Sequence, residues 1–251
     1  MTKSKTDWFE TWFDTPYYPI LYKHRDEKEA ELFMNNLLDY CQLPKNSHIL
    51  DLGCGQGRHS IFLHKLGYQV TGIDLSKNRI NAAKEYKAAN IQFVQADMRT
   101  AFPEKYDAIF NLFTSFGYFL EEEDDLRILQ NIKNSLTENG IVVIDFLNTL
   151  LATKNMVSNE LKEIDNTHFT IDRYINNGFL MKEIQVGGKK YYERVKCLDL
   201  ESIGRLVHQV GFRIIDTFGD YHLNPFDVKK SPRLIIVLKA ETIRLNNSQF
   251  D

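Results

Sequence analysis

The stretch "ILDLGCGQGRHSIFL", residues 49–63, decides the fold class of this chain. An apolar run ends at Asp51, and a helical pattern begins at Arg58. Between them lie three glycines at alternate positions: Gly53, Gly55 and Gly57. Glycine adopts backbone angles closed to other residues and lets a ligand approach the main chain, and the first turn of a helix has unpaired N–H groups. The stretch therefore predicts a strand, a nucleotide-binding turn and a helix.

The residues around this turn indicate which nucleotide it binds. A dinucleotide-binding turn reads G-x-G-x-x-G, and here Arg58 stands at the last glycine. The Gly-Lys-Ser/Thr of a P-loop is absent. Asp74 follows Gly53 by 21 residues at the predicted end of the second strand, where a carboxylate accepts hydrogen bonds from a ribose. Asp97 follows the third strand, where it can accept the adenine amine while the Met98 N–H faces the ring. Acids at these strand ends would repel a diphosphate, which favours a nucleoside without phosphates.

Strand and helix patterns alternate on both sides of the turn, which predicts a parallel sheet covered by helices. The predicted strands are residues 48–52, 69–75, 91–97, 106–113 and 141–147. The predicted helices are residues 27–42, 57–67, 77–89 and 121–136, the last ended by Asn139 and Gly140. The fold class is therefore α/β, a doubly wound sheet.

The alternation stops after Asn148. Residues 150–163 look helical or irregular, and three strands are predicted at 168–175, 179–186 and 190–198. Asn177-Gly178 and Gly187-Gly188 have the chemistry of hairpin turns, so these strands form a small antiparallel insert. A helix at 200–211, strands at 212–218 and 233–240, and a tail complete the chain.

Composition limits the class of protein. The 251 residues are 43% hydrophobic and 26% charged, with a net charge of −3, which argues against nucleic acid or an anionic membrane as a general partner. Three scattered cysteines suggest neither zinc nor another metal, and they are typical of a reducing, cytoplasmic setting. The start of the chain lacks the pattern of a signal peptide, and no apolar run is long enough to span a bilayer.

Five motifs, in order, resemble the class I S-adenosylmethionine-dependent methyltransferases: "ILDLGCGQG", "VTGIDLS", "FVQADM", "YDAIFNLF" and "LTENGIVVIDF". "GQGRHS", "NLFTSFGYF" and "SPRLIIV" together look like a bacterial small-molecule subgroup. The resemblance covers residues 45–148 and the last helix and strands. It implies seven strands in the order 3-2-1-4-5-7-6 with strand 7 antiparallel, and S-adenosylmethionine as cofactor, leaving S-adenosylhomocysteine as product.

We expect a single methyltransferase domain over residues 1–251. Its parts are an N-terminal helical lid (1–44), the cofactor-binding core (45–148), the antiparallel insert over the active site (149–197), and the final helix with strands 6 and 7 (198–240). The sequence does not give the oligomeric state.

The expected cofactor contacts combine the strand ends, the glycine turn and the lid. From the core they are Asp51, Gly53, Cys54, Gly55, Gly57, Arg58, Asp74, Leu75, Asp97, Met98 and Asn111. From the lid they are Tyr18, Tyr22 and Arg25, whereas Trp8, Phe9, Trp12 and Phe13 are expected to pack in the core. Cys54 also fits a small packed residue. The methionine carboxylate could be bound by Arg58, by His59 or by Arg25, and the sequence leaves this open.

The acceptor is expected where ligands bind in such sheets, at the carboxyl ends of the strands. Substrate candidates are Ser115, Tyr118, Arg173, Arg194, Tyr221 and Arg233. Tyr18, His24 and His222 are candidates for a general base, but none has a partner readable from sequence, so no catalytic residue is assigned.

The sequence favours transfer of a methyl group to a nitrogen or oxygen of a small molecule. "NLFT" differs from the Asn/Asp-Pro-Pro-aromatic motif of enzymes that methylate base or glutamine amino groups. Two alternatives stay open: a cofactor-binding regulatory or scaffold protein without transfer activity, and a methyltransferase acting on protein or RNA. A dinucleotide oxidoreductase is a third, against which Arg58 and Asp97 argue.

Overall fold

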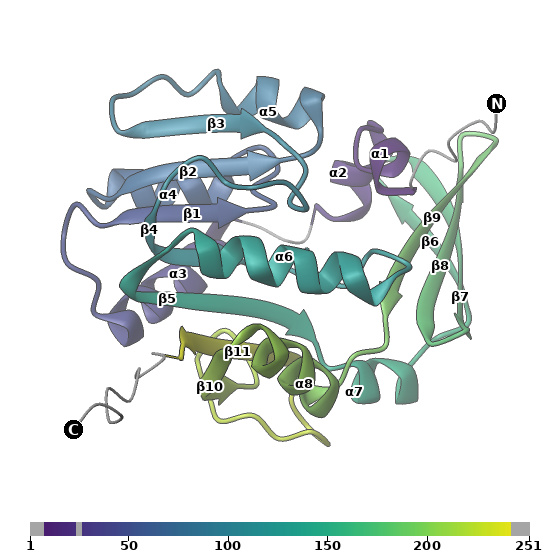
Figure 1. Ribbon diagram of the computed structural model, residues 1–251. Coiled ribbons are helices and arrows are strands. Elements are labelled where there is room, and N and C mark those ends of the chain that lie inside the picture. The colour runs from purple at the N-terminus through teal and green to yellow at the C-terminus, as the bar shows by residue number, and fades with distance from the viewer. Residues whose placement is uncertain (1–7, 24–26, 242–251) are drawn as a thin grey trace, which may run out of the picture.

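The computed structural model describes residues 8–23 and 27–241. Its main body is a seven-stranded sheet in the order β10-β11-β5-β4-β1-β2-β3 (Figure 1). The strands are β1 (His48–Leu52), β2 (Gln69–Asp74), β3 (Ile91–Gln95), β4 (Tyr106–Asn111), β5 (Leu136–Leu147), β10 (Phe212–Phe218) and β11 (Arg233–Ala240). Only β11 runs antiparallel to its neighbours, β5 and β10. The predicted order 3-2-1-4-5-7-6 is confirmed.

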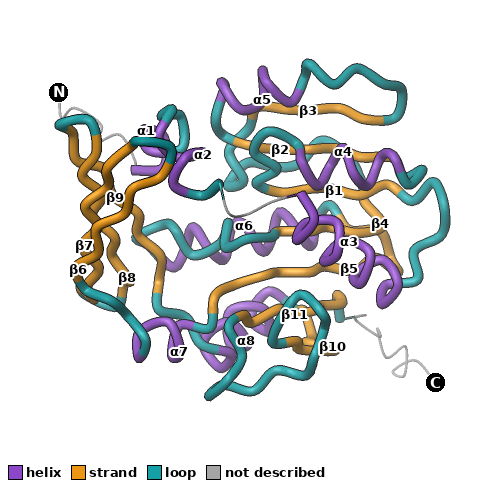
Figure 2. Tube along the Cα trace, turned by 180° about the vertical axis from the view of Figure 1, so that it is seen from behind, coloured by secondary structure: helices purple, strands orange, loops and turns teal. Residues whose placement is uncertain are grey.

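Helices cover both faces of this sheet because its strands alternate apolar side chains between the two faces. Ile49 packs on one face, against α3 (Glu27–Cys41) and α4 (Arg58–Lys65), and Leu50 packs on the other face. The first face also carries α5 (Lys77–Ala83), and the second carries α6 (Glu122–Asn134) and α8 (Leu200–Val210), as the two views show (Figures 1 and 2). None of the helices in the described ranges is long and apolar enough to cross a membrane.

A second, four-stranded antiparallel sheet stands at the carboxyl end of the core strands. It consists of β6 (Asn159–Ile164), β7 (Thr167–Asn176), β8 (Phe179–Val186) and β9 (Lys189–Lys196), and it follows α7 (Thr149–Lys154). Positive φ angles at Asn177-Gly178 and Gly187-Gly188 confirm both predicted hairpin turns. Residues 8–23 form α1 (Trp8–Trp12) and α2 (Tyr17–Leu21), which lie beside this sheet (Figures 1 and 2).

Three sequence predictions about elements were wrong. The insert has four strands, because residues 159–164 pair with β7 through a tight turn at Asp165-Asn166, although this edge strand leaves Leu161 82% exposed. The helix predicted to reach residue 136 ends at Asn134, because Leu136 already pairs with Tyr106 in the sheet. The helix predicted to reach residue 89 ends at Ala83.

Candidate active site

The glycine turn lies between β1 and α4, and all three of its glycines have positive φ. A Cβ atom on Gly53 would lie 2.8 Å from Cβ of Ser115, so the approach of the Ser115 loop requires glycine there. A Cβ atom on Gly57 would lie 2.6 Å from Cε1 of Phe93. Gly57 therefore permits close packing at the start of α4, and it lines none of the cavities described below, although the sequence predicted a cofactor contact.

Two carboxylates at strand ends, the buried Asp51 and the partly buried Asp74, fix the shape of this turn. Asp51 accepts a hydrogen bond from Oγ of Ser60 at 2.6 Å. Asp74 accepts bonds from the backbone N–H groups of Gly55 at 2.9 Å and Ser76 at 2.8 Å. Burial raises the pKa of Asp51 to about 6, against the opposing effect of the Ser60 bond, and burial likewise raises the pKa of Asp74. The Asp74 carboxylate is thus held beside the backbone of the glycine turn.

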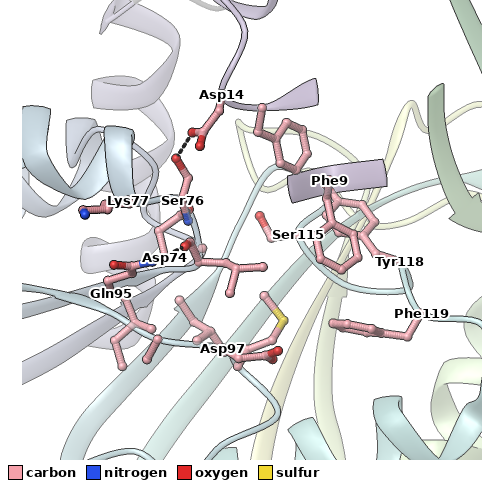
Figure 3. Close-up of a pocket in the computed structure, with 17 residues that line it drawn as sticks. Phe9, Asp14, Asp74, Ser76, Lys77, Gln95, Asp97, Ser115, Tyr118 and Phe119 are labelled. Atoms are coloured by element: carbon pink, nitrogen blue, oxygen red, sulfur yellow. Dashed lines mark hydrogen bonds between the residues drawn. The ribbon is translucent and has the colours of Figure 1, made fainter. Parts of the chain in front are cut away.

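The first cavity, of about 330 Å³, lies beyond the ends of β2 and β3. Figure 3 shows Asp74 and Asp97 on one side of it and the rings of Phe9, Tyr118 and Phe119 on the other. Leu75 and Met98, which the sequence predicted as cofactor contacts, also line this cavity.

Neighbouring side chains fix the two polar ends of this cavity. Asp97 is paired with Arg99 at 2.6 Å. Burial alone would raise the pKa of Asp97, but the Arg99 hydrogen bonds outweigh it and lower that pKa. Asp14 accepts a hydrogen bond from Ser76, so the lid is fastened over the Asp74 end (Figure 3).

The second cavity, of about 310 Å³, lies over the glycine turn. Asp51, Cys54, Gly55 and Arg58 line it, together with Tyr18 and Tyr22 from the lid. It shares Phe13, Gly53, Asp74, Ser115 and Tyr118 with the first cavity. The two cavities therefore form one continuous groove from Asp97 to Arg58.

Two arginines and a histidine line the far end of this groove. Arg58 stacks over the Phe113 ring, 5.1 Å from its centroid, and its Nη2 lies 3.4 Å from Nε2 of His59. His59 also stacks on Phe113. Burial, with Arg58 adding to it, lowers the pKa of His59 to about 3, so His59 is neutral near pH 7. Arg79, which sequence reasoning missed, also lines this end and donates from Nε to the Phe13 carbonyl at 3.0 Å.

The buried His59 makes the stability of the protein depend on pH. The pKa of His59 is about 3 in the folded protein and about 6.5 in the unfolded chain. At pH values between these two, the unfolded chain binds a proton that the folded protein does not, so the free energy of unfolding decreases as the pH is lowered. From pH 7 to pH 5 we expect wild type to lose about 2 kcal/mol through this residue, and His59→Gln to lose correspondingly less.

Urea unfolding of both proteins at pH 7 and pH 5 measures this difference. The raised pKa of Asp51 acts in the opposite direction, but it acts in both proteins. His222→Gln, at an exposed position, is the matched control for loss of a histidine. Equal losses of stability in wild type and His59→Gln would contradict the prediction.

A third cavity, of about 240 Å³, opens between the groove and the four-stranded sheet. It shares Phe13 and Tyr118 with both parts of the groove, and Tyr18, Tyr22 and Phe113 with the second cavity. We call these five side chains the aromatic collar. The collar lines the place where the third cavity meets the groove. A molecule bound in the third cavity would therefore face a molecule bound in the groove at this place.

Charged side chains of the four-stranded sheet line the third cavity in a row. Arg173 on β7 stands opposite Lys182 on β8, which stands opposite Glu193 on β9. Glu193 accepts hydrogen bonds from the Tyr22 hydroxyl and from Nε1 of Trp12, each at 2.6 Å. Lys182 donates to the Tyr22 hydroxyl at 2.6 Å. The row therefore anchors the lid to the sheet, and Tyr22 contacts this row as well as lining the groove.

A buried ion pair forms the opposite wall of the third cavity. Arg233 at the start of β11 donates from Nε to Asp145 of β5 at 2.8 Å, and from Nη2 to Oγ1 of Thr114 at 2.9 Å. Asp145 is fully buried and also accepts the backbone N–H of Phe113 at 2.8 Å. Tyr221 packs beside this pair, with its hydroxyl 3.3 Å from Asp145. Tyr221 thus supports Arg233 without lining the cavity.

Several predicted site residues lie outside these cavities. Asn111 is buried and donates to the Leu52 carbonyl at 2.9 Å, so it holds two core strands together. Arg194 bonds the Tyr118 carbonyl, and His222 is exposed on the loop after β10. His24 and Arg25 lie outside the described residues. The structure therefore places His222 outside the site, and His24 stays a prediction from the sequence.

Sequence reasoning missed other residues of the site. These are Asp14, Lys77, Arg79, Gln95, Phe119, Lys182, Glu193 and, behind the wall, Asp145. Asp145 carried a readable signal, an acid inside the apolar run of β5, whereas Lys182 and Glu193 look like the polar positions of any hairpin. No group of three or more metal-ligating side chains occurs within residues 8–23 and 27–241.

Comparison with known proteins places this geometry in a family. Residues 43–196, more than half of the chain, match the family described as a methyltransferase domain. A putative methyltransferase, YqeM of Bacillus subtilis, is 36% identical over 107 residues, which are 41% of this chain and 43% of that protein, so the match spans less than half of this relative. A glycine/sarcosine N-methyltransferase of Aphanothece halophytica is 26% identical over 78% of this chain and 76% of its own length.

The fold has a close counterpart among solved structures. The crystal structure of an S-adenosylmethionine-dependent methyltransferase from Clostridium acetobutylicum superposes with a TM-score of 0.77 at 16% identity, over 90% of this chain and 96% of that one. With the family match and the confirmed strand order, the chain belongs to the methyltransferase domain family, the S-adenosylmethionine-dependent enzymes that its motifs resemble.

Proposed function

We propose that this protein transfers the methyl group of S-adenosylmethionine to a nitrogen of a small-molecule acceptor bound in the third cavity. The observation that carries the proposal is the aromatic collar, which joins a nucleoside-sized groove to a separate, smaller cavity. A transferase needs two binding sites that meet at one point, and the collar residues line both.

The side chains at the two ends of the groove suit the two ends of the cofactor, acids toward the nucleoside and cations toward the methionine carboxylate. Asp74 would accept the ribose hydroxyls, and Asp97 with the Met98 N–H would bind adenine against the aromatic side of the first cavity. Gly53 and Gly55 line the second cavity, where the methionine portion would lie. His59 is neutral and Lys23 is paired with Asp165 at 2.8 Å, so Arg58 and Arg79 are the described cations of this cavity best suited to the methionine carboxylate. Arg25 stays a candidate from the sequence.

The cofactor, when bound, supplies a methyl group already activated on a sulfonium. The residues of the chain therefore have to align the acceptor and exclude water. The collar rings can serve both purposes, since they line the junction between the groove and the third cavity. A neutral amine needs no base, and an ammonium must first lose a proton. Of the three base candidates, Tyr18 lines both the groove and the third cavity.

Cavity size and one relative support a small amine as acceptor. About 240 Å³ accommodates a molecule of metabolite size, and aromatic and charged side chains enclose it. The Aphanothece halophytica relative, aligned over most of this chain, is a glycine/sarcosine N-methyltransferase. Transfer to oxygen would need a base beside the collar, which makes it the weaker alternative.

Incubation with methyl-labelled cofactor and a metabolite extract tests the proposal. We expect label in a low-molecular-weight product that mass spectrometry identifies as a methylated amine. Label in the protein or RNA fraction would favour a macromolecular acceptor instead. Calorimetric binding of S-adenosylhomocysteine without any labelled product would favour the regulatory or scaffold role.

A further inference from the structure

The third cavity has a charge pattern that the transfer reaction itself does not require. The charged side chains that line it are Arg173, Lys182, Arg233 and Glu193. The surplus of cations faces inward, whereas the acids that balance Arg173 and Arg233 stand behind them, at Glu160 and Asp145. An amine acceptor alone would be repelled by such a surface, so the surplus indicates an anionic group on the acceptor.

The sheet register shows that this pattern costs stability. Arg173 and Lys182 stand directly opposite each other on neighbouring strands, an arrangement that like charges destabilise. The same face carries apolar side chains two residues along, where Ile171 lies opposite Ile184 and Ile184 opposite Tyr191. This apolar row packs against the lid, while the charged row faces the cavity. Lys182 is compensated by Glu193 and Tyr22, which leaves Arg173 as the cation of the row without a partner inside the cavity.

The side chains of Arg173 and Arg233 are held by hydrogen bonds and still have N–H donors that these bonds do not use. Arg173 donates from Nη2 to Glu160 at 2.7 Å and from Nη1 to the Val157 carbonyl at 3.2 Å, while Arg233 uses Nε and Nη2 on Asp145 and Thr114. Nε of Arg173 and Nη1 of Arg233 have no hydrogen-bond partner within the described part of the chain. Each guanidinium therefore keeps one nitrogen, Nε of Arg173 and Nη1 of Arg233, that can donate a charge-assisted hydrogen bond to a carboxylate.

We propose that the acceptor is an amine that also carries a carboxylate, and that Arg173 and Arg233 bind this carboxylate. The inference rests on the proposed function and specifies the substrate class of the same site. Three cations and one acid line the cavity, but the acids behind the lining, Asp145, Glu160 and Glu29, offset the remaining positive charge, so the site suits an acceptor with one carboxylate better than a phosphate dianion. The aliphatic side chains Leu147, Leu180 and Val195 enclose the carbon chain between the two groups.

The test is a panel of amines with methyl-labelled cofactor. Amino acids and N-methyl amino acids, including glycine and sarcosine, are each paired with their amides, and methylamine and phosphoethanolamine complete the panel. We expect transfer to at least one carboxylate-bearing amine, with kcat/KM about 10- to 100-fold above that of its amide, the range for loss of hydrogen bonds to a charged group.

Variants separate binding of the carboxylate from support of the fold. Arg173→Gln is expected to raise KM for the accepted amine about 10- to 100-fold, with kcat and the affinity for S-adenosylhomocysteine little changed. Arg173→Lys is expected to restore part of the loss, and Arg233→Lys to raise KM in the same way. Arg205→Gln, which removes an exposed arginine–glutamate pair on α8, is the matched control and is expected to behave as wild type.

Three results would overturn the inference. They are preferred transfer to an amide, methylamine or phosphoethanolamine; transfer to no carboxylate-bearing member of the panel; and an Arg173→Gln variant that loses cofactor affinity as much as acceptor affinity. Methylation of any other amine would leave the proposed function standing. Cofactor binding without transfer to the panel or to an extract would overturn both.

Discussion

Asp74→Ala is expected to weaken binding of S-adenosylhomocysteine about 100-fold or more. The carboxylate is held at the groove by the N–H groups of Gly55 and Ser76, and it faces the place where a ribose would lie. Two hydrogen bonds to a charged group, at about 1.5–3 kcal/mol each, give a loss of about 3 kcal/mol or more, which corresponds to the expected factor. Isothermal titration calorimetry measures the change.

Two further variants distinguish loss of ribose binding from general damage. Asp74→Asn keeps the shape of the side chain and is expected to bind with intermediate affinity. Asp216→Asn changes a surface aspartate that also accepts hydrogen bonds, from Tyr40 and from the Thr217 N–H, and it should bind as wild type. An Asp74→Ala protein that binds within threefold of wild type would contradict the assignment of the groove.

Arg233→Met is expected to lower the free energy of unfolding by about 3–5 kcal/mol, because it leaves the fully buried Asp145 charge without its partner. In a protein of this size that corresponds to a fall in melting temperature of about 6–20 °C. Thermal and urea unfolding at pH 7 measure it.

The double variant Arg233→Met/Asp145→Asn tests the cause of this loss. It removes the buried charge while an amide oxygen can still accept the Phe113 N–H, so it is expected to recover most of the stability. A single variant that loses less than about 1 kcal/mol, or a double variant no more stable than the single one, would contradict the argument.

The core of the fold could be predicted because its signals are local. Strands buried on both faces read as continuous apolar runs, and acids such as Asp74 and Asp97 mark their carboxyl ends. Parallel strands bring their carboxyl ends to one edge of the sheet, so the acids lie near one another there independently of how the insert and the N-terminal helices fold. Elements with a weak apolar pattern were missed: β6 has little hydrophobic periodicity and exists because the turn at Asp165-Asn166 pairs it with β7.

The third cavity was harder to predict because its residues come together only across sheets. Arg173, Lys182 and Glu193 lie in three hairpin strands where charged residues normally face water. The lid covers that face, and Trp12 and Tyr22 bond Glu193, which turns a solvated row into the wall of a cavity. No spacing in the sequence encodes that contact. His222 illustrates the reverse: its loop follows a core strand as expected, yet its side chain is exposed.

The sequence by itself determined the class of sheet, the glycine turn and the acids at the carboxyl edge, because each depends on residues near in the chain or on the ends of parallel strands. The order of the strands followed from the resemblance of the motifs to a known family, and the structure confirms it. Only the tertiary structure decided which side chains line the third cavity, because the lid, the four-stranded sheet and the Arg233–Asp145 pair meet through contacts between segments far apart in the chain. It also shows a difference between the two residues that follow Gly57: burial leaves His59 neutral, whereas Arg58 is one of the cations that line the end of the groove.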